Sequence, residues 1–263
     1  MTKKLLAAIG VLVLAAGAAG AYAFWPRDAK EVSKQEAVED FRDRQGTTTT
    51  NPEASEPSEP SGPAAGVYEF EATGTESVKL GPLPAEERTL GPKVTASVVT
   101  GEKGCFTWTL NLFKEHTEDT DFCPSGTGLK LVTHIKNQTF GALTPKLVMT
   151  CDPGLLPGPG EPDKDIACEL KLEGGPVPVS TAVKGTASTS QAKSFEVDGQ
   201  SVEATPVTVS FTVSGDISGT WVETTWWFDS NLPIRLERDL DLKGPATLFE
   251  SSELQLLSLQ PGT

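Results

Sequence analysis

Histidine is scarce in this sequence, and the residues that usually accompany a catalytic histidine are missing around it. The 263 residues include only His116, in a polar turn, and His134, on the same face of a predicted strand as Lys130 and Lys136. Neither has a recognisable nucleophile partner. The chain has no G-x-S-x-G segment, and two separated histidines do not supply the ligands of a usual metal triad. We therefore expect no enzyme activity, no cofactor and no metal site.

Positive charge is also in short supply, with 22 basic against 36 acidic residues and a formal net charge of −14. Most of this excess, −12, lies after Gly66, in the part expected to fold. Such a surface repels nucleic-acid phosphates, so no nucleic-acid partner is predicted. Acidic pairs such as Glu86 and Glu87, or Glu118 and Asp119, are interpreted as solvated charge and not as tuned general acids.

Long hydrophobic runs are absent, with one exception at the N-terminus. Residues 5–25 carry no charge and follow Lys3 and Lys4. As a helix the run would reach about 31 Å, close to the hydrocarbon thickness of a bilayer, with Trp25 at headgroup level. Because lysines stay on the cytoplasmic side, we predict a single-pass anchor in the cell membrane, a cytoplasmic tail at 1–4, and the bulk of the chain extracellular.

The competing interpretation of this run is a signal peptide. Ala21, Tyr22 and Ala23 fit the small-x-small cleavage pattern, and cleavage near Ala23 would give a secreted protein. The anchor is favoured because the run is longer than a usual signal core.

Residues 26–45 are predicted to form a short juxtamembrane helix. Ser33 and Glu36 have the spacing of a capping box, and an apolar strip with Phe41 follows. This helix is interpreted as a spacer near the bilayer, or alternatively as a docking element. Residues 46–66 contain four prolines and little to bury, which predicts a disordered Pro/Ser/Thr-rich linker that holds the domain away from the membrane.

The four cysteines lack C-x-x-C spacing and a nearby histidine, which argues against zinc. All of them lie in the part predicted to be outside the cytoplasm, where disulfides persist. Four cysteines permit three pairings, and the sequence alone does not choose among them. The local pairing, Cys105 with Cys123 and Cys151 with Cys168, is favoured because each pair brackets one plausible hairpin.

Residues 67–263 read as one extracytoplasmic β domain. Short runs rich in Val, Thr and aromatic residues alternate with Gly, Pro, Asp and Asn. Val207, Val209, Phe211 and Val213 alternate with polar residues, as in a half-buried antiparallel strand. The predicted fold is all-β, a curved antiparallel sheet or half-barrel of roughly 11 to 13 strands.

A weak internal sequence repeat suggests that this domain consists of two related β halves. The segments VTAS and VTVS are offset by 113 residues, and the same offset aligns Trp108 with Trp221. The halves would cover 67–170 and 180–263. Chance identity among so many Val and Thr residues is the alternative.

Several segments resemble known families. The V-S-x-x-E-A-V-x-x-F-R stretch, the V-Y-E-F-x-x-T-G and G-C-x-x-x-W segments, and W-x-F-D-x-x-L-P-I-R at 226–235 together resemble a family of membrane-anchored secreted proteins of actinobacteria, over most of the chain. The last segment is also similar to LolA-like and mycobacterial lipoprotein carrier proteins. That resemblance implies a curved sheet holding acyl chains, although the chain lacks their lipobox cysteine.

The candidate ligand-binding residues lie on one predicted hairpin, strands 221–228 and 232–242. They are three tryptophans, one phenylalanine and one arginine: Trp221, Trp226, Trp227, Phe228 and Arg238. Adjacent Trp226 and Trp227 must leave a strand on opposite faces. A loop or second sheet would cover the second face; alternatively it lines a ligand cleft or forms a protein-binding patch.

Arg238 interrupts the apolar face of strand 232–242. In the ligand interpretation it would bind a phosphate or carboxylate headgroup. A bulge that turns it outward into solvent is favoured instead.

We therefore predict a membrane-anchored extracytoplasmic binding module of the cell envelope, for an apolar or amphiphilic, lipid-like ligand. The alternative is a protein-interaction or scaffolding module with an envelope protein partner and no small-molecule ligand.

Overall fold

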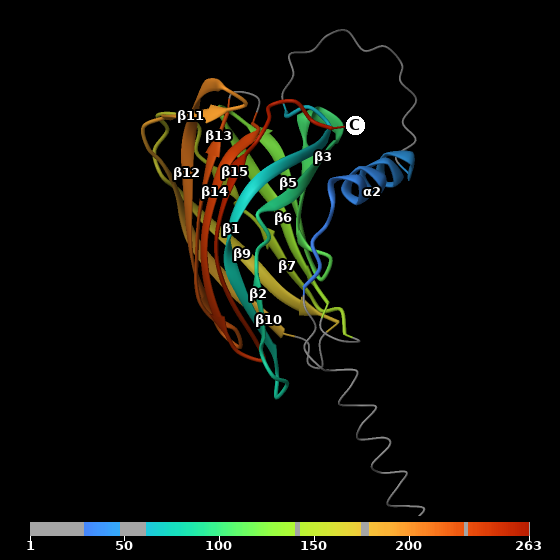
Figure 1. Ribbon diagram of the computed structural model, residues 1–263. Helices are drawn as coiled ribbons and strands as arrows, with labels where there is room; N and C mark the ends of the chain where they lie inside the picture. Colours follow the sequence, from blue (N-terminus) through green and yellow to red (C-terminus); the bar gives the residue numbers. More distant parts are fainter. Residues whose placement is uncertain (1–28, 48–61, 140–142, 175–178, 229–230, 263) are drawn as a thin grey trace, which may run out of the picture.

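The computed structural model describes residues 29–47, 62–139, 143–174, 179–228 and 231–262. Within these residues nearly all regular structure is β, in fifteen strands of one antiparallel sheet (Figure 1). The elements are α2 (Lys34–Thr47), β1 (Gly66–Leu80), β2 (Glu86–Thr89), β3 (Lys93–Thr100), the 3-10 turn η1 (Glu102–Gly104), β4 (Phe106–Phe113), β5 (His116–Ser125), β6 (Gly128–Gln138), β7 (Lys146–Cys151), β8 (Leu155–Leu156), β9 (Lys164–Glu173), β10 (Val179–Thr189), β11 (Lys193–Val197), β12 (Gln200–Ser214), β13 (Ser218–Trp227), β14 (Pro233–Lys243) and β15 (Ala246–Leu256).

The sheet closes on itself as a barrel of 12 strands. Around the barrel the order is β10-β9-β7-β6-β5-β4-β3-β1-β15-β14-β13-β12, and residues 182–189 of β10 pair with 207–214 of β12 to complete it. The all-β antiparallel class is confirmed, but the sheet closes completely, whereas a curved sheet or half-barrel was predicted. Pairing of the last two edges leaves no unpaired edge in the ring, which removes the main hazard of an open sheet.

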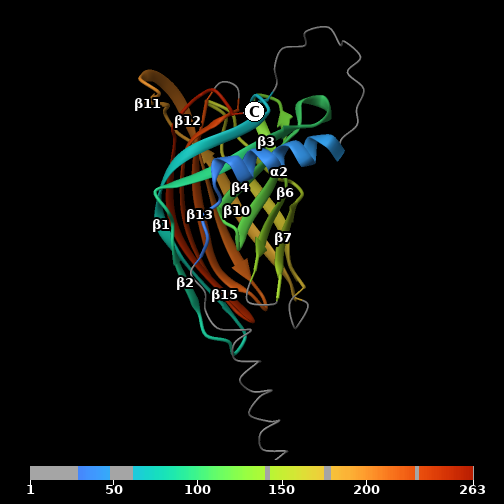
Figure 2. The same ribbon diagram turned by 45° about the vertical axis from the view of Figure 1, so that its right-hand side comes forward.

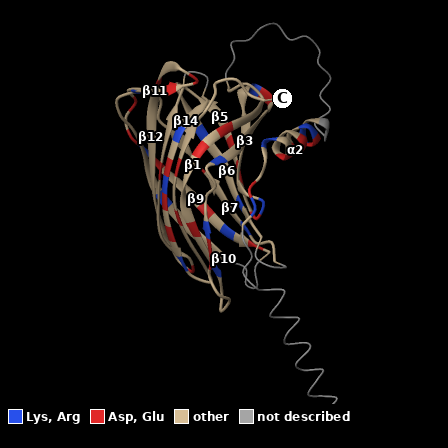
Figure 3. Cartoon of the chain, in the orientation of Figure 1, with Lys and Arg blue, Asp and Glu red and all other residues tan. Residues whose placement is uncertain are grey.

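Alternation along each strand separates the interior of the barrel from its surface. In β9, Ile166 and Leu170 are buried while Glu169 and Lys171 are exposed. The buried residues of nearly all the strands merge into one hydrophobic core inside the barrel. Figure 3 shows acidic and basic residues distributed along the strands and over α2.

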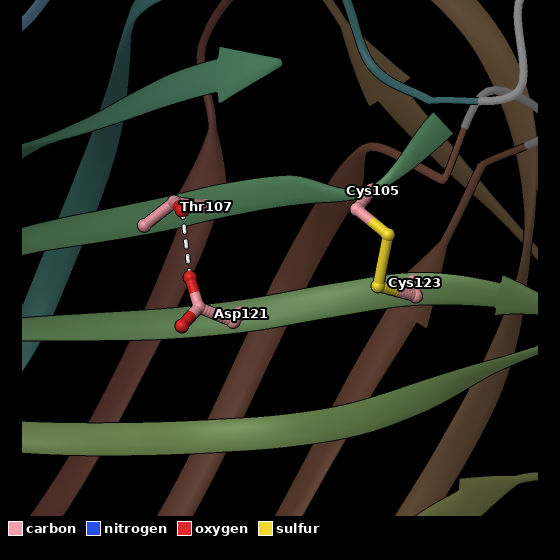
Figure 4. Close-up of a disulfide and its surroundings, with 4 residues drawn as sticks. All are labelled: Cys105, Thr107, Asp121 and Cys123. Carbon is pink, nitrogen blue, oxygen red and sulfur yellow. Dashed lines mark hydrogen bonds between the residues drawn. A yellow bond between two sulfur atoms is a disulfide. The ribbon is translucent and has the colours of Figure 1, made fainter. Parts of the chain in front are cut away.

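Both disulfides have the predicted local pairing. Cys105 pairs with Cys123 across β4 and β5 (Figure 4), and Cys151 faces Cys168 directly across β7 and β9. The first closes a hairpin, as expected, whereas the second joins neighbouring strands with β8 between them in the chain. Two disulfides indicate an oxidising, extracytoplasmic location for the barrel.

Helix α2 begins as the sequence predicts. The Ser33 backbone N–H donates to Glu36 Oε2 at 3.0 Å, and the Glu36 N–H donates to Ser33 Oγ at 3.3 Å, which completes the capping box. The buried side chains Ala37 and Phe41 pack on Val67. The predicted helix is therefore present, and its apolar strip packs on the outside of β1 and β3 (Figure 2).

Ion pairs fix α2 to the barrel. Lys34 Nζ lies 2.8 Å from Glu69, and Arg44 Nη1 lies 3.0 Å from Asp119. The helix and β1 thus belong to one body, so the predicted linker at 46–66 connects two parts of that body. Its expected role as a tether holding the barrel away from the membrane stays a prediction, while the described helix α2 is docked on the barrel.

The predicted cytoplasmic tail and anchor or signal peptide lie outside the described residues, as do residues 48–61 of the linker. Among the residues that the structure describes, no helix has the length and apolar character needed to cross a bilayer.

One strand pair keeps its register under the 113-residue offset. Val98 faces Trp108 across β3 and β4, and the equivalent residues Phe211 and Trp221 face each other across β12 and β13. The neighbouring pairs, β1 with β3 and β10 with β12, do not keep this register. Duplication into the halves 67–170 and 180–263 stays a hypothesis.

Replacing Phe41 with aspartate is expected to release α2 while the barrel stays folded. A carboxylate in the apolar contact with Val67 would lack a hydrogen-bond partner. Undocking of the helix costs less free energy than burial of this unpaired charge. Hydrogen exchange should show lost protection of residues 34–47 and unchanged protection of the strands. The exposed control Glu39→Ala should keep the helix protected, and a docked helix in Phe41→Asp would contradict this account.

Candidate functional site

Trp226 and Trp227 leave β13 on opposite faces, as predicted. Trp227 points into the barrel against Phe122, with 5.2 Å between ring centroids. Trp226 lies on the other face but is only 5% exposed, because Phe195 of β11 covers it at 5.9 Å and the Arg235 guanidinium lies over its ring at 5.8 Å. The β11–β12 hairpin therefore covers the face of β13 that carries Trp226.

The structure does not form the protein-binding patch that exposed tryptophans would provide. Val222 and Phe249 are the exposed large hydrophobic side chains among the described residues, and Trp226 and Trp227 are not among them.

Arg238 points into the barrel and is 4% exposed, so the expectation that a bulge turns it into solvent is wrong. Its Nε donates to Glu223 at 2.8 Å, and its Nη1 donates to Glu118 at 2.8 Å and to Glu250 at 2.9 Å. Three carboxylates of the protein surround the guanidinium, so the structure does not support a role in binding a ligand headgroup.

Arg238 belongs to a buried charge cluster inside the barrel. The cluster has four carboxylates, two arginines, one lysine and one histidine: Glu76, Glu86, Glu118, Glu250, Arg88, Arg238, Lys136 and His116. Arg88 bonds Glu76 at 2.8 Å and Glu86 at 2.7 Å, and Lys136 bonds Glu118 and Glu250. The interpretation of Glu86 and Glu118 as solvated charge is therefore wrong, since they are 7% and 1% exposed.

His116 is held protonated by the carboxylates of this cluster. Burial lowers the pKa of His116, but the carboxylates of Glu76 and Glu118 outweigh burial and raise the pKa to about 9. Burial raises the pKa of Glu250, but Arg238 and Lys136 outweigh it and hold the pKa at about 2. At neutral pH the protonated His116 therefore faces the carboxylates of Glu76 and Glu118 as a cation.

The stability of the barrel should be greatest near pH 6.5 and fall on both sides. The folded pKa of His116, about 9, lies above its ordinary value of 6.5, so the stabilisation is complete below pH 6.5 and is lost as pH rises through 9. Burial lowers the pKa of His134 to about 3, so stability also falls as pH drops from 6.5 toward 3.

Denaturant unfolding at a series of pH values measures this dependence. His116→Gln should remove the alkaline decline, and His134→Gln should reduce the acid one. A free energy of unfolding that stays flat between pH 6.5 and 9 in the unmodified chain would show that His116 is not held protonated.

Three groups of the cluster lie close enough to share one cation. Ligand atoms of Glu76, His116 and Glu250 lie within 4.8 Å of one another. Their carboxylates are already paired with Arg88, Lys136 and Arg238, however, so a metal ion would have to displace built-in cations. We assign the cluster a structural role.

A small cavity lies between the charge cluster and one end of the barrel. That end, here called the mouth, is formed by residues 127–129, 157–159 and 227–228, beside β11 in Figure 1. The cavity has a volume of about 40 Å³, and its wall includes Phe122, Met149 and Trp227. The ring of Trp221 separates it from the cluster, with Lys136 Nζ at 5.4 Å and Arg238 Cζ at 5.7 Å from the ring centroid.

A groove of about 170 Å³ lies at the mouth itself. Leu156, Val207 and Trp227 line both the groove and the cavity, so the two spaces adjoin. Phe228 lines the groove but not the cavity.

Of the predicted ligand residues, Trp227 and Phe228 line the groove at the mouth, Trp221 lines the adjoining cavity, and Trp226 and Arg238 line neither space. Sequence reasoning missed His134, Thr120 and Glu223 in the cavity wall. A signal was present for Glu223, which lies two residues after Trp221 on the same strand face. No such signal marks His134, whose strand contacts Trp221 only across the barrel.

No protein-family model, curated protein or solved structure matches this chain, so its function has to be inferred from the geometry of the barrel.

Proposed function

We propose that this protein is an extracytoplasmic binding module that holds a small apolar or amphiphilic molecule at the mouth of its barrel. The observation that carries the proposal is the pair of adjoining spaces, with largely apolar walls in the cavity and Trp227 between them. Binding sites are typically concave and apolar with a few placed polar groups, and this end of the barrel has that character.

The volumes limit the size of the ligand. Pockets for drug-sized ligands usually measure about 300–1,000 Å³, whereas the cavity and groove have about 40 and 170 Å³. A complete acyl chain is too large for this space. The proposed ligand is therefore a small molecule, or a larger one that inserts only one end.

The proposed function is binding without chemistry. Perturbed pKa values often mark catalytic groups, but here they belong to a cluster whose carboxylates are already bonded to Arg88, Lys136 and Arg238. Glu118 and Glu250 are each 2% exposed or less, so a substrate cannot reach them.

The mouth lies opposite the end at which the N-terminal segment joins the barrel. The Lys30 N–H donates to Glu115 at 2.9 Å, and the Lys114 N–H donates to the Lys30 carbonyl at 2.8 Å, both at the β4–β5 turn. Only three residues separate Ala29 from the predicted anchor at 5–25. In the proposed arrangement the mouth faces away from the membrane and takes its ligand from that side.

Native mass spectrometry of the full chain, purified from its own host, tests the proposal. We expect a fraction of the molecules to carry one bound small molecule, and we expect tryptophan fluorescence to change when hexan-2-one or 1-hexene is added. A clean mass of the unliganded chain, together with unchanged fluorescence, would count against a binding function.

A further inference from the structure

Two buried nitrogen atoms in the wall of the cavity lack a hydrogen-bond partner among the described residues. They are Nε1 of Trp221 and Nε2 of His134, in side chains that are 3% and 5% exposed. Both residues line the cavity, and their ring centroids lie 4.9 Å apart. Buried polar groups almost always have a partner. Their position on the cavity indicates that the partner comes from a molecule inside it.

We assign both nitrogen atoms as donors. The indole nitrogen can only donate. His134 is neutral at physiological pH, because burial lowers its pKa to about 3. Its Nδ1 lies 2.8 Å from Thr120 Oγ1, which makes no other hydrogen bond among the described residues. Donation from the Thr120 hydroxyl to Nδ1 satisfies both groups, and it leaves the single ring proton of His134 on Nε2.

The charges around the cavity disfavour an ionic ligand group. Glu223 lines the cavity and is 24% exposed, so a carboxylate or phosphate would face a carboxylate. An ammonium group would face two N–H donors, and Lys136 and Arg238 lie behind the Trp221 ring. A neutral oxygen atom, which accepts hydrogen bonds without adding charge, fits these surroundings.

The size of the cavity limits what reaches these donors. Its volume of about 40 Å³ is far below the roughly 300–1,000 Å³ of a pocket for a drug-sized ligand. One small functional group fills it. The rest of the ligand then lies in the adjoining groove, against Trp227 and Phe228.

We propose that the cavity binds the carbonyl or hydroxyl oxygen of a small neutral ligand, between the N–H groups of Trp221 and His134, while the apolar body of the ligand occupies the mouth groove. This inference rests on the proposed binding function and specifies its ligand class, a neutral ketone, aldehyde, ester or alcohol with a short apolar body.

The test compares five probes with the same six-carbon body and different heads: hexan-2-one, hexan-2-ol, 1-hexene, hexanoate and hexylamine. Affinities for the full chain are measured by following its indole N–H signals in nitrogen-15 NMR. The ketone and the alcohol should bind about tenfold tighter than 1-hexene, the effect of about one hydrogen bond. Hexanoate and hexylamine should bind more weakly than the ketone.

Trp221→Phe keeps an aromatic ring but removes the N–H, so it should weaken ketone binding about tenfold and leave 1-hexene binding unchanged. The matched control is Trp226→Phe, which removes another unpartnered indole N–H on the opposite face of the strand. It should change neither affinity. In the unmodified chain, the ketone should shift the Trp221 indole signal and not that of Trp226, a readout that needs no variant.

The outcomes separate this inference from the function on which it rests. If no probe binds, the proposed binding function fails. If 1-hexene binds as tightly as the ketone, or if hexanoate binds best, a small-molecule site exists but the assignment of a neutral oxygen is wrong. Ketone binding without a shift of the Trp221 signal would also overturn it.

Discussion

Replacing Arg238 with methionine is expected to lower the free energy of unfolding by about 3–5 kcal/mol. The Arg238 side chain is 2% exposed and bonds Glu223 as well as Glu118 and Glu250, whose side chains are each 2% exposed. Methionine fills similar volume but leaves the buried carboxylates of Glu118 and Glu250 short of one cation. Removal of one partner from a buried ion pair is costly for this reason. Urea denaturation followed by tryptophan fluorescence measures the loss.

A matched control lies on the same strand. Arg235 pairs with Glu237 and Glu253, whose side chains are 45% and 50% exposed. Arg235→Met should therefore cost less than about 1 kcal/mol. Adding Glu118→Gln to Arg238→Met should recover part of the lost stability, because it removes one of the unpaired charges. Equal losses for Arg238→Met and Arg235→Met would mean that the cluster is not a sealed ionic interior.

Removing both disulfides should have the largest effect on stability. The bonds Cys105–Cys123 and Cys151–Cys168 span 18 and 17 residues. A loop of this length is worth about 3 kcal/mol in the chain-entropy model. Because the bonds join different pairs of strands, their contributions should nearly add, to about 6 kcal/mol.

The measurement compares the oxidised chain with variants in which one or both cysteine pairs are replaced by alanine. Each single-pair variant should lose about half of the total. The native chain should also contain no free thiol, as the structure shows two closed disulfides. Four reactive thiols in the native protein, or a loss below 1 kcal/mol for the variant without disulfides, would contradict the account.

Local patterns in the sequence were sufficient for several features. The capping box of Ser33 and Glu36, the cysteine pairing and the opposite faces of Trp226 and Trp227 each depend on residues close together in the chain. Such features follow from the geometry of one turn or one hairpin. They place α2, both disulfides and two residues of the cavity wall, Trp221 and Trp227, correctly.

Closure of the barrel could not be predicted in this way. It depends on pairing between β10 and β12 and between β1 and β15, which brings residues 66–80 to the C-terminal strand. No residue of β1 predicts β15 as its partner, because the backbone groups of an antiparallel edge can bond any strand of suitable length. Whether the sheet closes therefore depends on the number, length and curvature of all its strands, which no local sequence pattern specifies.

The charged interior was missed because it inverts the usual pattern. In β5, His116 and Glu118 face inward while Thr117 and Asp119 are partly exposed. Every residue of this stretch is polar, so alternation gave no sign of which face was buried. The partners Arg238 and Glu250 lie more than 100 residues away, and only the closed barrel brings them to Glu118.

The central claim is that ligand enters the barrel from its mouth and stops above the charge cluster. Nuclear Overhauser contacts between hexan-2-one and the assigned side chains of the full chain test this claim most directly. We expect contacts with Leu156, Val207 and Trp227, which line both the cavity and the groove. Contacts confined to the exposed outer residues Val222 and Phe249 would contradict it.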